Sequence, residues 1–129
     1  MTHIQSPEQR AELVANLVAL SSKEYQQHVW VEGHSWGKVV HDEFDYAVHF
    51  FFDDSTLQRD PYDNIGWMLR DRAEADMVTA VIEAIDVVLV KYGNGLTDAE
   101  YIATPEWVAV VEAAGAALAV IPDSEKVPL

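Results

Sequence analysis

Residues 71–95 read DRAEADMVTAVIEAIDVVLVKYGNG, and this stretch decides the fold. Its apolar side chains recur every three or four positions, which places them on one face of an α-helix. They are Val78, Val81, Ile82, Ile85, Val88, Leu89 and Tyr92. Asp71 and Glu74 are typical of a helix start, and Gly93 begins a turn that ends the pattern. The stretch predicts a central core helix over about residues 71–92.

Capping signals predict further helices on both sides of this segment. Ser6 and Pro7 begin a helix over about 6–20, and a shorter helix follows between Ser21 and Gly33. After the central helix, Thr97 with Glu100 predicts a short helical turn. The last long helix is expected over 105–121, where Pro122 ends it, and its run of alanine and glycine at 113–117 lets another backbone approach closely.

Residues 42–54 fit two patterns. Phe44, Ala47, Val48 and Phe51 follow helical spacing, whereas the aromatic and β-branched content also suits a strand. We favour a helix with Asp42 as its N-cap. The expected fold is therefore all-α, a compact bundle of about five or six helices. The alternative is an α+β fold with a small two-stranded element near residues 28–32 and 46–52.

Length and charge restrict the class of protein. The 129 residues suit one domain, 1–129, and we expect residues 1–5 and 123–129 to be frayed. Eight basic and 22 acidic residues give a net charge of −14, which disfavours nucleic acid as a partner and favours a basic protein. The chain has no cysteine, no stretch long enough to span a membrane and no signal-peptide pattern, so we expect a cytoplasmic protein.

Aromatic and acidic residues concentrate in the first half of the chain. Over residues 42–63, seven acidic residues accompany one basic residue, Arg59. Aromatic anchors among carboxylates suit a face that binds a Lys- or Arg-rich protein. The candidate face comprises Trp30, Trp36, Asp45, Tyr46, Asp53, Asp54, Tyr62 and Trp67. The alternative interpretation is that most of these aromatics belong to the core and the acids are solvated.

Two other functions remain open. His41, Asp45 and His49 would share one face of a helix and could bind a divalent metal ion such as zinc, nickel or manganese. Alternatively, a partly buried His49 and a solvated His41 need no metal, and no cofactor is then expected. A homo-oligomer that buries the aromatic patch against itself is the third hypothesis. We find no nucleophile elbow, phosphate-binding loop or HExxH motif, so the sequence favours a protein without enzymatic activity.

Several segments resemble a known family. They are FDYAVHFFFDD at 44–54, IGWMLRD at 65–71, and Glu100-Tyr101 with Pro105 and Trp107. From Trp30 onward the chain resembles a family of small acidic actinobacterial proteins of unestablished function. The resemblance implies one domain in a bacterial cytoplasm and brings no catalytic residue. In size and charge the chain is also similar to immunity proteins that neutralise basic toxins, which implies an immunity-like role.

Overall fold

The computed structural model describes residues 4–54, 57 and 60–126, except the side chain of Asp54. This part of the chain contains six α-helices and no β-strand, so the predicted all-α fold is confirmed. The α-helices are α1 (Pro7–Ser21), α2 (Lys23–Tyr25), α3 (Phe44–His49), α4 (Arg72–Tyr92), α5 (Asp98–Ile102) and α6 (Trp107–Ala119). Two π-helical segments continue α2 and α3; they are η1 (Gln26–Val31) and η2 (Phe50–Asp54). Two 3-10 helices, η4 (Pro61–Asn64) and η5 (Asp123–Glu125), precede α4 and follow α6.

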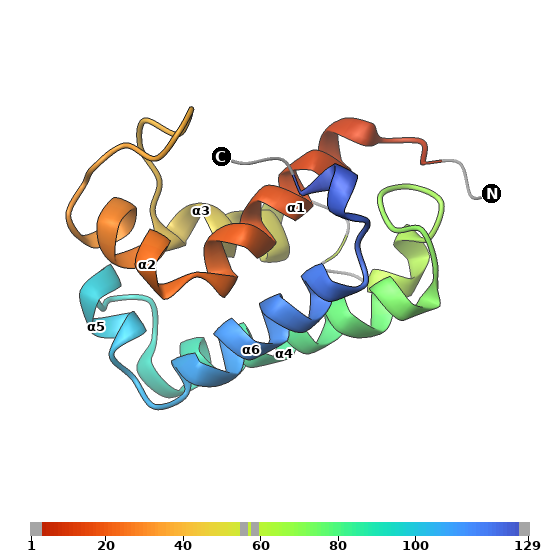
Figure 1. The fold of residues 1–129 in the computed structure, drawn as a ribbon. Helices are drawn as coiled ribbons and strands as arrows, with labels where there is room; N and C mark the ends of the chain where they lie inside the picture. Colours follow the sequence, from red (N-terminus) through yellow and green to blue (C-terminus); the bar gives the residue numbers. More distant parts are fainter. Residues whose placement is uncertain (1–3, 55–56, 58–59, 127–129) are drawn as a thin grey trace.

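Helix α6 packs against both α4 and α1, and Figure 1 shows α6 running alongside α4. The small side chains of α6 permit this, because Ala114 and Ala117 are buried in the contact. The apolar faces of α1, α4 and α6 meet in one core, whose fully buried members include Leu13, Leu17, Val81, Ile85, Trp107 and Val110. No helix of the described residues is both long and apolar enough to cross a membrane.

The central helix has the predicted bounds and caps. Asp71 Oδ1 accepts a hydrogen bond from the backbone N–H of Glu74 at 3.0 Å. Gly93 ends the helix at φ 73°, a left-handed conformation that favours glycine. Both features were readable from the sequence because capping depends on residues close to each other in the chain.

Residues 42–54 form α3 followed by η2, and the alternative of a hairpin between 28–32 and 46–52 is wrong. The predicted role of Asp42 is also wrong. Asp42 does not cap α3; the backbone N–H of Phe44 donates instead to Asp98 Oδ2 at 3.1 Å. Asp42 is engaged elsewhere, because Tyr25 and Trp30 both donate hydrogen bonds to its carboxylate.

The two ends of the chain lie partly outside the described residues. Residues 1–3 and 127–129, which belong to the segments predicted to be frayed, are outside the described part. Within the described part, the N–H of Gln5 donates to the carbonyl of Gly66 at 3.0 Å, and Asp123–Glu125 form η5. The organisation as a single domain stays a prediction.

Candidate functional site

A cleft of about 460 Å³ opens between α1, the segment before α3, and α3 itself. We call it the acidic cleft. It is lined by Glu12, Ala15, Asn16, Tyr25, Val39, His41, Asp42, Tyr46, His49 and Phe50. Among the described residues, this lining contains carboxylates, imidazoles and phenols but neither lysine nor arginine.

Helical spacing explains how α1 and α3 supply this lining. Glu12 and Asn16 are one turn apart on α1, at the edge of the face that buries Leu13 and Leu17. On α3, Tyr46 and His49 are three positions apart, while Phe44 and Ala47 face the core. Each helix therefore buries its apolar face and presents a polar edge to the cleft.

Asp42 is held in place by two aromatic donors. The hydroxyl of Tyr25 lies 2.8 Å and the indole Nε1 of Trp30 lies 2.9 Å from Asp42 Oδ2. Burial, reinforced by the hydrogen bond to Asp42, raises the pKa of Tyr25, so its hydroxyl keeps the proton that it donates. Both bonds go to Oδ2, and no side chain or backbone group in the described part of the chain donates to Oδ1.

Two further acceptors of the cleft have no partner among the described residues. They are the carboxylate of Glu12 and the hydroxyl of Tyr46, whose residue is 50% exposed. Together with Oδ1 of Asp42 they give the cleft three acceptor groups that no described residue satisfies. A ligand that complements it must carry several N–H groups and a positive charge.

Beside the cleft, His49 stands between two carboxylates of the predicted binding face. Its Nε2 lies 3.2 Å from Asp45 Oδ2, and its Nδ1 lies 2.9 Å from Asp53 Oδ2. The structure thus brings Asp45, Tyr46 and Asp53 together along α3 and η2. The side chain of Asp54 lies outside the described part.

The other predicted anchors do not join this group. Trp30 is only 8% exposed and packs in the core against Phe44 and Trp107. Trp36 is partly buried, with its ring 5.4 Å from that of Tyr25. Neither Trp30 nor Trp36 lines the cleft.

Tyr62 and Trp67 also lie away from the cleft. The hydroxyl of Tyr62 donates to Asp76 on α4, and Arg72 stands over its ring. Trp67 is 41% exposed and donates from Nε1 to Gln9 Oε1 at 2.9 Å. The described residues of the predicted face therefore lie in separate places: Asp45, Tyr46 and Asp53 along α3 and η2, and Trp30, Trp36, Tyr62 and Trp67 elsewhere.

His41 and His49 both line the cleft, but His41, Asp45 and His49 do not form a ligand set. His41 Nε2 lies 3.1 Å from Glu43 Oε2, whereas His49 contacts Asp45 and Asp53. Within the described residues, no group of three or more His, Asp or Glu side chains is placed to hold a metal ion. The divalent-metal alternative stays a prediction.

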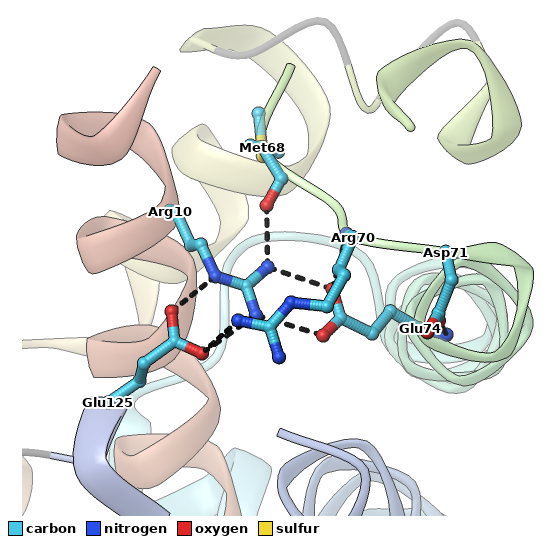
Figure 2. Close-up of polar contacts among 6 residues, drawn as sticks. All are labelled: Arg10, Met68, Arg70, Asp71, Glu74 and Glu125. Carbon is cyan, nitrogen blue, oxygen red and sulfur yellow. Dashed lines mark hydrogen bonds and ion pairs between the residues drawn. The ribbon is translucent and has the colours of Figure 1, made fainter. Parts of the chain in front are cut away.

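A second polar cluster surrounds Arg10, which is only 4% exposed (Figure 2). Its guanidinium forms a bidentate pair with Glu74 at 2.8 and 2.9 Å. It also donates to Glu125 at 2.6 and 3.1 Å and to the carbonyl of Met68 at 2.8 Å. These contacts use all five N–H donors of an arginine. Because no donor remains for a ligand, we assign this cluster to the fold.

Two more contacts extend the cluster around Arg10. Glu74 Oε1 accepts the backbone N–H of Arg70 at 2.7 Å, and the side chain of Arg70 donates to Glu125 at 3.1 Å. The pKa of Arg10 is raised mainly by its hydrogen bond to Glu74, whereas burial lowers that pKa. The cluster joins α1, α4 and η5, three elements that are distant in sequence.

Residues 4–126 match the model of a family described as "Domain of unknown function (DUF7945)". The chain belongs to the DUF7945 family. This match confirms the predicted membership of a family of unestablished function. The actinobacterial source and the likeness to immunity proteins stay predictions. No curated protein and no solved structure matches this DUF7945 chain.

Glu125 should make the stability of this DUF7945 domain depend on pH. The hydrogen bond from Arg10 lowers the pKa of Glu125 below its ordinary value of 4.5, although burial opposes this. The stabilisation from ionised Glu125 is therefore complete above pH 4.5 and is lost as the pH falls through the lower folded-state pKa.

We expect Glu125→Gln to lower the free energy of unfolding most near neutral pH, with a deficit that shrinks as the pH falls below 4.5. Urea denaturation followed by circular dichroism across this range measures the deficit. The exposed Glu83, replaced by glutamine, is the control and should show little deficit at any pH. A deficit in Glu125→Gln that is constant with pH would contradict the ion-pair explanation.

Proposed function

We propose that this protein binds a basic partner protein through the acidic cleft and the carboxylates of Asp45 and Asp53 beside it. The observation that carries the proposal is the unbalanced chemistry of the cleft. The carboxylate of Glu12, Oδ1 of Asp42 and the hydroxyl of Tyr46 are acceptors without a partner among the described residues, and the described lining holds no lysine or arginine. Lys or Arg side chains of another protein would supply the missing donors and the missing charge.

The charge of the whole chain favours the same class of partner. A net charge of −14 attracts basic proteins and accelerates their encounter, whereas close contacts decide how long the complex lasts. Tyr46, half exposed between Asp45 and the cleft, supplies apolar contact area in addition to its hydroxyl. Tyrosine is one of the residue types enriched among those that contribute most to binding at interfaces.

An immunity-like role is the finer form of this proposal. A small acidic protein that occupies the basic surface of a toxin would need the charge and the acceptor-rich cleft described here. What distinguishes this role from general protein binding is the effect on the partner. The immunity-like form requires that binding also abolishes a toxic activity of the partner.

The test compares two charge-reversal variants with equal net charge. The cleft variant is Glu12→Lys with Asp45→Lys, and the control is Glu83→Lys with Asp86→Lys on exposed positions of α4. Each replacement of an acid by lysine raises the net charge by two, so the two replacements in each variant change it from −14 to −10. Any difference between them therefore reports the position of the charge and not its total.

Each protein is expressed with an affinity tag in the organism that naturally produces it. It is then purified under non-denaturing conditions and measured by native mass spectrometry. We expect a basic partner to remain with the wild type and the α4 control, and to be lost from the cleft variant. With the purified partner, the cleft variant should raise Kd by about tenfold or more. Equal retention by both variants would show that the cleft is not the binding site.

The same spectra test the homo-oligomer hypothesis. A wild-type mass at a multiple of 14.4 kDa, without another protein, would favour self-association over a basic partner.

A further inference from the structure

We propose that the acidic cleft seats one arginine side chain of the partner, with its guanidinium between Asp42 and Glu12. This inference rests on the proposed function, because it names the group that the cleft recognises. Three features of the cleft favour an arginine: the arrangement of its acceptors, its aromatic residues, and the hydrogen bonds that hold Asp42.

The acceptors belong to different elements and face one space. Asp42 precedes α3, Glu12 is on α1 and Tyr46 is on α3, yet all three line the same cleft. A guanidinium offers five N–H donors in a planar fork and can bond to separate acceptors at once. An ammonium is a compact point charge at the end of a flexible chain and matches such a spread of acceptors less well.

The walls of the cleft favour the same group. Three aromatic residues, Tyr25, Tyr46 and Phe50, belong to the lining; Tyr46 is half exposed, whereas Tyr25 and Phe50 are buried. A guanidinium stacks on aromatic faces and is more weakly hydrated than an ammonium, so it loses less on entering such a space. At about 460 Å³, the volume lies within the usual range for pockets that bury a compact ligand group.

Asp42 is positioned before any ligand arrives. Its Oδ2 is fixed by Tyr25 and Trp30, and the ring of Trp30 packs edge to face on the fully buried Trp107 at 6.0 Å. The carboxylate is thus tied to the core, and its Oδ1 is left for a ligand. A charged acceptor that is already ordered lowers the entropic cost of binding.

The experiment uses three small probes and the intact protein. The probes are the N-acetyl methylamides of arginine, lysine and citrulline, in which citrulline keeps the shape of arginine without its charge. Binding is followed by two-dimensional NMR of the 15N-labelled protein. We expect the arginine probe to shift the amide signals of Asp42, Tyr46 and their neighbours, the lysine probe to bind several-fold more weakly, and citrulline not to bind.

Variants locate the arginine probe in the cleft. Glu12→Gln should weaken binding of the arginine probe by about tenfold, while Glu83→Gln should leave it unchanged. The side chain of Glu12 is exposed and makes no hydrogen bond or ion pair with a described residue, so its replacement should not disturb folding. Asp42→Asn serves as a second variant only if its circular dichroism spectrum and melting temperature match the wild type, because Asp42 also holds Tyr25 and Trp30.

Equal binding of the arginine and lysine probes, or equal effects of Glu12→Gln and Glu83→Gln, would overturn the arginine assignment. If the cleft charge-reversal variant still loses the partner while the α4 control keeps it, the basic-partner function holds without the arginine assignment. If both charge-reversal variants keep the partner equally, the proposed function itself is wrong, whatever the probes show.

Discussion

Replacing Glu74 with alanine should lower the free energy of unfolding by about 3–5 kcal/mol. Glu74 is buried and forms both arms of the bidentate pair with Arg10, which is itself buried. Its removal leaves the Arg10 charge with only Glu125 as a counter-charge and also removes the acceptor of the Arg70 N–H. Since small domains are stable by only about 5–15 kcal/mol, the loss is a large fraction of the total.

Urea denaturation at pH 7 measures the loss of free energy of unfolding in Glu74→Ala, and thermal unfolding should show a Tm lower by roughly 10–20 °C. Glu83→Ala on the same helix is the control, because Glu83 is exposed, and it should change stability by less than about 0.5 kcal/mol. A double-mutant cycle with Arg10→Met separates the pair from its surroundings. If Glu74→Ala were no worse than Glu83→Ala, the ion pair would not be the stabilising contact that we describe.

The second large effect is expected at Gln26, which is fully buried at the start of η1. Its Nε2 donates to the carbonyls of Ala19 and Leu20 at 2.9 and 2.8 Å, near the end of α1. Its Oε1 accepts from Nε1 of Trp107 at 2.9 Å. One amide thus satisfies three polar groups that are shielded from water.

Gln26→Leu should cost about 3 kcal/mol, although leucine is close in size and more apolar. The reason is that two carbonyls and one indole N–H lose their partners in the core, and each unpaired group is penalised. The neighbouring Gln27→Leu is the matched control, because Gln27 is exposed and bonds only to Glu32. A neutral or stabilising Gln26→Leu, measured by thermal and urea unfolding, would show that these groups find other partners.

Much of the fold was predictable from the sequence because helices depend on local patterns. Ser6, Asp71 and Thr97 cap the helices that they were expected to cap, through hydrogen bonds to residues three positions later. The cap of α3 was not predictable in this way. Its acceptor comes from Asp98, 54 positions away, and this leaves Asp42 to bind Tyr25 and Trp30.

The candidate site was predictable only in part. Asp45, Tyr46 and Asp53 follow one another along α3 and η2, so the sequence could group them. Glu12 was missed because its place in the cleft depends on how α1 packs beside α3. The available signal was its position with Asn16 on the polar side of α1, but that side is usually solvated. Trp30 was misplaced on the surface face because composition alone does not show which aromatic side chains the core takes.

The cluster around Arg10 also has a consequence for biosynthesis. It joins a residue near the start of the chain to Glu74 in the middle and to Glu125 close to the end. A ribosome releases the N-terminal helix long before it has made the residue that completes the guanidinium's set of acceptors. Until then Arg10 lacks two of its five bonds. The native arrangement can therefore close only after Glu125 has left the ribosome, and a nascent chain halted before residue 125 should remain open to proteases.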